Sequence, residues 1–351
     1  MKQFLFSAIL ILLLLISTSA QSSNLLFPIV VNGKWGFINK IGEVVIKPQF
    51  DSAGHFRNGL AVASKDKKVG YINEDGQFFV IKIPPQMILS SEFSEGLASV
   101  RIGPKGRYLD ETGKIAHKEG YIDKTGKIVI SPQYIHAGSF KNGLARIRNE
   151  RGISFINRSG NFITKLYTNG FEFSEGLANV QIDGKWGYIN TSDNIVIKPV
   201  FDGAEEFSEG LASVRINDSR GFVNKNGEVV IAPQFDYTTP FSEGLAAVET
   251  NRKWGYVDKT GRFVIKPQFN IAHNFSEGLA SVQNNNKWGY IDKSGKIVIE
   301  AQFDEVYAFK SGIATVYSGV CNIDERTLKR VPPCKLGYID KIGRYIWKPT
   351  N

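Results

Sequence analysis

Carboxylates recur along this 351-residue chain at positions where a row of cation ligands could form. One set is the Glu of Phe-Ser-Glu-Gly segments, and the other is the Asp that follows Pro-x-Phe or a variant of it. The residues are Glu95, Glu175, Glu209, Glu243 and Glu277, and Asp51, Asp202, Asp236 and Asp304. Calcium needs six or more oxygens in one tight cluster, and Asn58, Asn142 and Ser311 replace Glu in other copies. We therefore interpret these acids as turn residues and expect no metal site.

The four histidines do not form a catalytic pattern. His55, His117, His136 and His273 fall at unmatched positions, without zinc spacing and without a nucleophile-His-acid arrangement. Neither a phosphate-binding loop nor a dinucleotide fingerprint is present. We expect no enzyme and no cofactor; a hydrolase whose site is assembled between repeats is the alternative.

Tryptophan recurs at one slot of the repeated segment and could bind a ligand. Trp35, Trp186, Trp254 and Trp288 at equivalent places could form an aromatic row that stacks on sugars or peptide. Glu119 and Arg220 fill the same slot in other copies, which predicts a semi-exposed position. The alternative is that each Trp covers the core of the next unit from outside.

Two cysteines are present, Cys321 and Cys334, and both fall in one insertion. In an exported protein this pattern predicts a disulfide, which would be worth about 3 kcal/mol in the chain-entropy model. Two free thiols are the alternative.

The elements that carry these residues are tandem repeats. The aromatic two residues after the Trp slot is the marker of each copy. It falls at Phe37, Tyr71, Tyr121, Phe155, Tyr188, Phe222, Tyr256, Tyr290 and Tyr338. Six of the eight gaps lie within one residue of 34, and the two longer gaps carry insertions of 16 and 14 residues. A fixed period of this kind indicates tandem structural units.

Each copy predicts three strands, namely Leu-Ala-Ser-Val, Trp-Gly-Tyr-Ile and Lys-Ile-Val-Ile. The turn between the last two carries Gly, or Asp193 in one copy, and predicts a positive φ. Runs such as Val44-Val45-Ile46 predict a strand covered on both faces, ended by the following Pro. The third residue of Leu-Ala-Ser-Val varies, so we expect it to face water, and the Phe of Phe-Ser-Glu-Gly to anchor the core.

The fold class predicted is all-β, a tandem array of about nine three-stranded antiparallel units. We expect an open, β-solenoid-like superhelix, because both ends of the array hold whole units and nine exceeds the usual four to eight propeller blades. A closed ring or propeller is the alternative. The array spans 21–351, with irregular insertions near 82–119 and 318–335.

Residues 1–20 resemble a signal peptide, with Lys2, an apolar stretch from Phe4 to Ile16 and small residues at Thr18-Ser19-Ala20. The apolar stretch is shorter than the roughly 20 residues of a spanning helix. We expect cleavage near Gln21, a secreted, periplasmic or cell-envelope protein and no membrane span after cleavage. Retention of the segment as an anchor is the alternative.

The copies that begin Lys34-Trp35-Gly36, Lys185-Trp186-Gly187, Lys253-Trp254-Gly255 and Lys287-Trp288-Gly289 resemble the WG (KWG) repeat family. The resemblance covers roughly 33–349 and implies a β-rich tandem-repeat protein, often bacterial and exported. It brings no catalytic residues. Val69, Glu119, Ile153, Arg220 and Leu336 depart from the motif at the Trp slot, and Ser154 at one Gly slot.

These observations predict an exported, non-catalytic repeat scaffold that binds a protein or a cell-envelope ligand. A carbohydrate- or cell-wall-binding module is the alternative, since the formal net charge of +9 favours anionic envelope polymers. The basic residues are spread evenly instead of clustered, so we expect no nucleic-acid partner.

Overall fold

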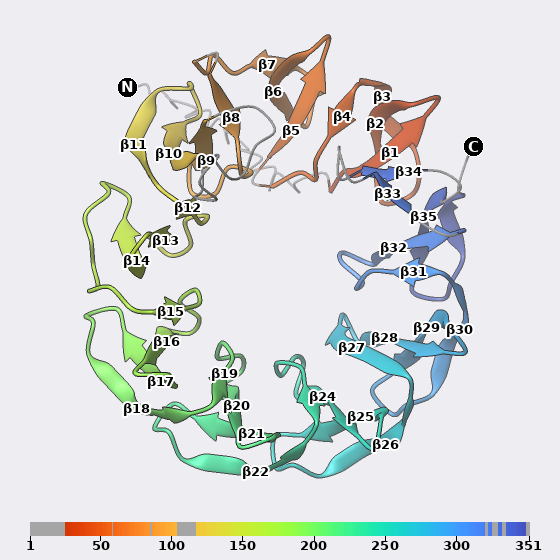
Figure 1. Cartoon of the computed structure of the whole chain (residues 1–351). Coiled ribbons are helices and arrows are strands. Elements are labelled where there is room, and N and C mark those ends of the chain that lie inside the picture. The colour runs from red at the N-terminus through yellow and green to blue at the C-terminus, as the bar shows by residue number, and fades with distance from the viewer. Residues whose placement is uncertain are drawn as a thin grey trace, which may run out of the picture.

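The computed structural model describes residues 25–57, 59–84, 86–103, 117–319, 322–324, 329–331 and 335–348. Within these ranges every regular element is a β-strand. Nine small antiparallel sheets follow one another around a central opening, one for each repeat (Figure 1). We number them blade 1 to blade 9 in chain order.

Seven blades run outward from the central opening as four strands, and blades 1 and 4 have three strands among the described residues. The inner strands are β4 (Ser52–Ala53), β8 (Met87–Leu89), β12 (His136–Ala137), β15 (Asn169–Gly170), β19 (Gly203–Ala204), β23 (Tyr237–Thr238), β27 (Ile271–Ser276) and β31 (Glu305–Val306). The second strands are β1 (Phe27–Val31), β5 (Leu60–Lys65), β9 (Leu97–Ile102), β13 (Leu144–Asn149), β16 (Leu177–Ile182), β20 (Leu211–Ile216), β24 (Leu245–Thr250), β28 (Leu279–Asn284) and β32 (Ile313–Ser318).

The third strands are β2 (Lys34–Ile38), β6 (Lys68–Asn73), β10 (Lys118–Asp123), β14 (Gly152–Asn157), β17 (Lys185–Asn190), β21 (Ser219–Asn224), β25 (Lys253–Asp258), β29 (Lys287–Asp292) and β35 (Lys335–Asp340). The outer strands are β3 (Val44–Phe50), β7 (Phe78–Val80), β11 (Ile128–Tyr134), β18 (Ile195–Phe201), β22 (Val229–Phe235), β26 (Phe263–Phe269), β30 (Ile297–Phe303) and β36 (Tyr345–Trp347). A separate hairpin, β33 (Asn322–Asp324) and β34 (Lys329–Val331), interrupts blade 9.

The three predicted strands of each unit are its second, third and outer strands. The short inner strand was not predicted, because two residues such as Gly203-Ala204 carry no periodic pattern of their own. The turn glycines have φ between +81° and +91°, and Asp193 has φ +63°. Both values confirm the left-handed turn that the sequence predicts.

The Gly after each Trp slot permits a close approach between the third and outer strands. A Cβ on Gly255 would lie 2.5 Å from the Ile265 carbonyl oxygen and 2.7 Å from the Pro267 nitrogen. In blade 4 Ser154 takes this position, and that blade has no regular outer strand among the described residues. The Ser154 hydroxyl instead donates to the Thr164 carbonyl at 2.8 Å.

Two predictions about burial are wrong. The third residue of Leu-Ala-Ser-Val is buried in most copies, as Asn179 and Ser213 show at 0% and 2% exposure. Conversely, Val44 and Val45 are 44% and 45% exposed at the ring's edge, and only Ile46 of that run is buried, at 3%. Inner residues of a blade are covered on both faces by neighbouring blades, whereas its outermost strand is not.

The predicted strand end at proline is also wrong. Pro48 lies inside β3, where the pairing with β2 shifts register. An outer strand has no neighbour on its far side, so a missing N–H and a local bulge are tolerated there.

Aromatic pairs join each blade to the next. Tyr188 of blade 5 packs on Phe207 of blade 6 at 4.8 Å between ring centroids, and its hydroxyl donates to the Glu205 carbonyl at 2.8 Å. Seven other blades repeat the ring pair, with centroids 4.6–4.8 Å apart. The Phe of Phe-Ser-Glu-Gly is thus the core anchor that the sequence predicts.

The ring closes, so the closed alternative holds and the open superhelix does not. Tyr338 of blade 9 packs on Phe27 of blade 1 at 5.5 Å, and its hydroxyl donates to the Pro28 carbonyl at 2.6 Å. A Cβ on Gly42 would lie 2.5 Å from the Ile346 carbonyl oxygen. The fold is a nine-bladed β-propeller whose closure uses side chains, without a blade shared between the termini.

Candidate interaction face

The two faces of the ring differ in the connections that they carry. One face, here called the motif face, carries the Phe-Ser-Glu-Gly loops and the turns between third and outer strands. The other, the insertion face, carries the connections between second and third strands and the links between blades. In blade 6 these are residues 217–218 and 236.

Periodic Lys and Asp residues on the insertion face pair with each other. Lys185, which precedes Trp186, contacts Asp202 of the following link at 2.5 Å. The same pairing joins Lys34 to Asp51 and Lys287 to Asp304, both at 2.6 Å. These link acids therefore fix the crossover between blades.

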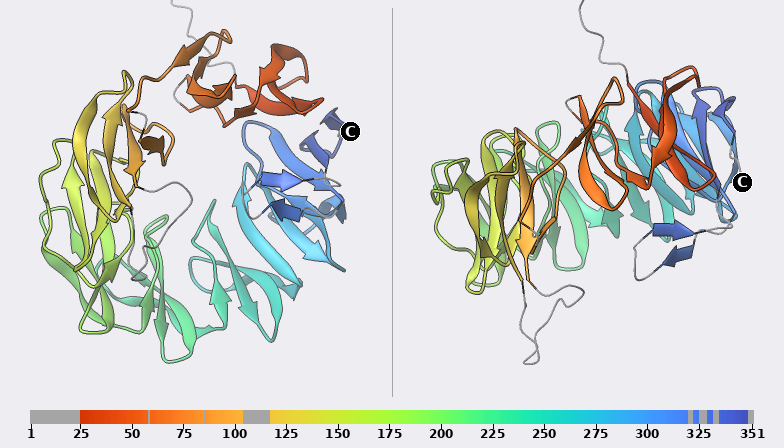
Figure 2. Two further views of the ribbon diagram at one scale, coloured as in Figure 1. Left: turned by 45° about the horizontal axis from the view of Figure 1, so that its top comes forward. Right: turned by 90° about the horizontal axis from the view of Figure 1, so that it is seen from above.

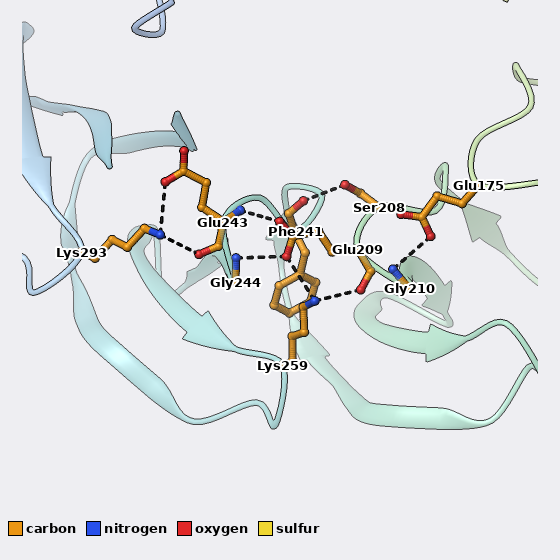
Figure 3. A network of polar contacts seen from close by, with 9 residues as sticks. All are labelled: Glu175, Ser208, Glu209, Gly210, Phe241, Glu243, Gly244, Lys259 and Lys293. Atoms are coloured by element: carbon orange, nitrogen blue, oxygen red, sulfur yellow. Dashed lines mark hydrogen bonds and ion pairs between the residues drawn. The ribbon is translucent and has the colours of Figure 1, made fainter. Parts of the chain in front are cut away.

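Periodic Glu and Lys residues on the motif face clamp each blade to the next (Figure 3). The Glu209 carboxylate of blade 6 accepts from the N–H groups of Glu243 and Gly244 of blade 7, at 2.5 and 3.0 Å. Lys259 of blade 7 contacts the same carboxylate at 3.2 Å and donates to the Glu209 carbonyl at 2.9 Å. Burial alone would raise the pKa of Glu209, but Lys259 and the two N–H groups outweigh it and hold that pKa low.

The clamp recurs along the ring. Glu175 accepts from the Gly210 N–H at 3.0 Å, and Glu243 from the Gly278 N–H at 3.0 Å. The five Glu side chains occupy turn positions with φ from +50° to +55°. In the described part of the chain, no group of three or more His, Cys, Asp or Glu side chains is placed to hold a metal ion.

The Trp slot is covered by a residue in the inner strand or just past it. His273 stacks on Trp288 with centroids 4.5 Å apart, and Phe171 lies 5.6 Å from Trp186. Trp186 and Trp288 are consequently 9% and 8% exposed, while Trp35 and Trp254 are half-buried.

Where the Trp slot holds a charge, a matching partner covers it. Arg220 donates to the Glu205 carboxylate at 3.1 Å. Glu119, 7% exposed, accepts from the Ala137 N–H at 2.7 Å and lies 3.4 Å from His136 Nδ1. The side chain at the Trp slot is therefore packed against a neighbouring side chain, and the type of that neighbour changes with the residue in the slot.

The two long insertions both leave the ring on the insertion face. The connection between β9 and β10 holds residues 103–117, and the connection between β32 and β35 holds the hairpin β33–β34. Both replace what is a two-residue turn in blade 6. Figure 2 (right) shows the β33–β34 hairpin projecting from the ring on this side. Cys321 and Cys334 lie outside the described residues.

A family model for the WG containing repeat matches 35–68, 120–151, 153–186, 186–218, 221–254, 254–288 and 288–319. These segments make up more than half of the chain. The chain belongs to the WG-repeat family. No curated protein matches this WG-repeat sequence.

The fold is similar to that of a solved structure. A structure titled as the eukaryotic initiation factor is 14% identical with a TM-score of 0.65, covering 93% of this WG-repeat chain and 96% of its own. BamB from Moraxella catarrhalis is 10% identical, with a TM-score of 0.40 and coverage of 84% and 92%. Hsv2 from Kluyveromyces lactis is 10% identical, with a TM-score of 0.36 and coverage of 81% and 96%. Among the described residues, no helix has the length and apolar character to cross a membrane.

Proposed function

We propose that this WG-repeat propeller is a non-catalytic scaffold that binds a protein partner through its insertion face. The observation that carries the proposal is that both long insertions leave the ring on that face. Regular two-residue turns would suffice to build the blades. Extra chain that projects from a rigid scaffold is where binding residues are commonly found.

The periodic charged residues support this assignment by elimination. Lys185 and Asp202 hold a link between blades, and Glu209 and Lys259 hold a clamp. Side chains engaged in such contacts are less available to a ligand. The two long insertions are not part of these repeated contacts between blades.

A crosslinking experiment in the native envelope tests the proposal. One variant replaces residues 319–334 with Asn-Asn, the sequence that joins β28 to β29, and a second does the same for 103–117. A control variant changes the regular turn Asn285-Asn286 to Asn-Gly, on the same face. We expect the insertion variants to lose crosslinks to a protein that the wild type and the control retain.

Identical crosslinks from all four proteins would contradict the proposal. Capture of envelope polysaccharide alone, by all four proteins and only at low salt, would favour the carbohydrate-binding alternative.

We further propose that the protein works outside the cytoplasm after cleavage near Gln21. The support is the sequence pattern of residues 1–20, which lie outside the described residues. Mass spectrometry of the native protein should give a chain that starts near Gln21. A mass that retains 1–20 would favour the anchored alternative.

A further inference from the structure

The boundary between blades 6 and 7 departs from the Lys–Asp pairing of the insertion face. Four links between blades carry an Asp, namely Asp51, Asp202, Asp236 and Asp304. The residue 17 positions earlier is Lys for three of them, but it is Ser219 for Asp236. Asp202 also accepts from the Asn217 N–H at 2.7 Å. The Asp236 carboxylate has neither contact, and it has no ion pair with any residue that the structure describes.

A pocket of about 610 Å³ lies at this boundary. It opens on the insertion face, because two of its lining residues, Asp218 and Arg252, stand in the turns between second and third strands. In blades 1, 5, 7 and 8 the Lys is followed by Trp. Blade 6 has Ser219-Arg220 instead, so its boundary with blade 7 has neither the indole nor the bridging ammonium group.

Two of the three arginines that line the pocket are already engaged. Arg220 donates to the Glu205 carboxylate at 3.1 Å. Arg215 donates through its Nη atoms to two backbone carbonyl groups, at 2.9 and 3.1 Å. Arg252 has no such contact with a described residue, so one guanidinium is left to balance the acids of the pocket.

The three acids that line the pocket are not engaged. Asp218, Asp236 and Glu249 have no ion pair and no side-chain hydrogen bond within the described ranges. The Asp236 N–H donates to the Glu249 carbonyl at 3.0 Å, so the two acids lie on neighbouring strands. Burial and the charge of Asp236 together raise the pKa of Glu249. A cation that enters the pocket would relieve the repulsion between these carboxylates.

The other boundaries of the ring show which cation fits beside a link acid. In blades 1, 5 and 8 a Lys ammonium group lies 2.5–2.6 Å from the equivalent Asp. At the link after blade 7, Asn270 accepts from Lys253 at 2.7 Å. Asp236 occupies the same position of the repeat. Tyr237, 59% exposed, also lines the pocket, and an aromatic ring attracts an ammonium group.

We propose that the pocket between blades 6 and 7 binds the ammonium group of a Lys side chain that a partner protein presents to the insertion face. The incoming Lys takes the place that Ser219 leaves open, with Asp236 as its main contact. Asp218 and Glu249 add charge complementarity. The inference rests on the proposed function for its partner, but blades 6 and 7 build the pocket without either insertion.

A blocked tripeptide, acetyl-Gly-Lys-Gly-amide, tests the proposal by ligand-observed NMR with the purified protein. We expect saturable binding with a dissociation constant on the order of 1 mM. The norleucine analogue, which has no ammonium group, should not bind. Asp236→Asn should weaken binding about tenfold. Asp202→Asn is the matched control, because Lys185 already occupies Asp202 and the affinity for the tripeptide should not change.

Ser219→Lys is the complementary variant. Its ammonium group should pair with Asp236 as Lys185 pairs with Asp202. Binding of the tripeptide should then be lost, while the urea midpoint should not fall. Ser219→Ala adds no charge and should bind the tripeptide as the wild type does.

Four results would overturn the proposal. The first is equal binding of the Lys and norleucine tripeptides, and the second is equal affinity of the wild type and Ser219→Lys. The third is equal weakening by Asp236→Asn and Asp202→Asn. The fourth is tighter binding of n-butylamine than of the tripeptide, which would assign the pocket to a small amine.

The insertion variants separate this test from that of the proposed function. The replacements of 103–117 and 319–334 should keep tripeptide binding, because neither segment lines the pocket. Loss of partner crosslinks in those variants, together with no tripeptide binding by the wild type, would leave the insertion-face proposal standing and reject this one.

Discussion

The glycine after the Trp slot leaves no room for a side chain, because the third and outer strands approach each other closely there. We expect Gly255→Ala to destabilise the protein by about 3 kcal/mol or more, because its Cβ would meet backbone atoms of β26 at 2.5 and 2.7 Å. Gly244→Ala is the control. Gly244 has φ +88° and nothing within 4 Å of its Cβ position, so only backbone strain of about 1 kcal/mol applies. Urea unfolding measures both changes, and equal costs would contradict the argument.

Glu119 and His117 make blade 3 sensitive to acid. Burial lowers the pKa of His117, and contacts with His136 and the Ala137 N–H lower the pKa of Glu119 although its burial alone would raise it. Both groups bind protons more readily in the unfolded chain. Their contribution to stability is therefore complete above about pH 6.5 and falls as the pH drops through the His117 and then the Glu119 range.

Urea midpoints between pH 7.5 and 4 test this expectation with Glu119→Gln. The Gln side chain keeps an acceptor for the Ala137 N–H but has no charge to lose. The variant should be less stable than the wild type at pH 7.5, and the difference should shrink as the pH approaches 4. A difference that does not vary with pH would show that the charge of Glu119 has no part in stability.

At the scale of the element, the Phe-Ser-Glu-Gly loop joins two blades. We expect Glu209→Ala to cost about 2 kcal/mol, because two N–H groups of blade 7 lose a charged acceptor. Lys259→Ala should cost less than 1 kcal/mol, since its ion pair is 46% exposed on the Lys side. Hydrogen exchange at Gly244 should accelerate in the Glu209 variant and change little in the Lys259 variant. The reverse order would show that the ion pair carries the clamp.

The strands and turns show how much of a repeat's conformation and burial can be predicted from its sequence. The turn glycines, Asp193 and the core Phe residues obey local rules, so their conformation and burial could be predicted. The exposure of Val44 and Val45 could not, because an apolar run does not say whether neighbouring units will cover it. The burial of Asn179 could not be predicted for the same reason. A polar side chain is expected to be exposed unless a hydrogen-bond partner is known, and the partner of Asn179 is the Ala204 carbonyl of the next blade, at 2.5 Å.

The candidate interaction sites depend on the assembled ring and were correspondingly harder to predict. The insertions could be recognised as long gaps in the repeat period, but the sequence did not indicate that both leave the ring from one face. The Trp slot was visible as a variable position, whereas its covers, His273 and Phe171, stand in segments without a motif. The contact between Tyr338 and Phe27 exists only because the ring closes, which no single repeat encodes.

At the scale of the whole molecule, stability is a sum over the interfaces between neighbouring blades, including the closing interface between blades 9 and 1. Between most blades the covalent chain keeps partners together even when a hydrogen bond is lost. Between blades 9 and 1, at the seam of the ring, no chain connects them, so side-chain contacts hold the ring shut. They are an apolar cluster that includes Phe27, Ile29, Ile313 and Tyr338, and the hydrogen bond from Tyr338 to Pro28.

Tyr338→Phe therefore tests closure, with Tyr256→Phe as its matched control. Each removes one hydroxyl that donates to a backbone carbonyl of the next blade, at 2.6 Å to Pro28 and 2.8 Å to His273. Each should cost about 1 kcal/mol globally. Only Tyr338→Phe should accelerate hydrogen exchange in both β1 and β35, because opening at the seam leaves the other blades intact. Equal local effects in the two variants would mean that the seam is no weaker than any other boundary between blades.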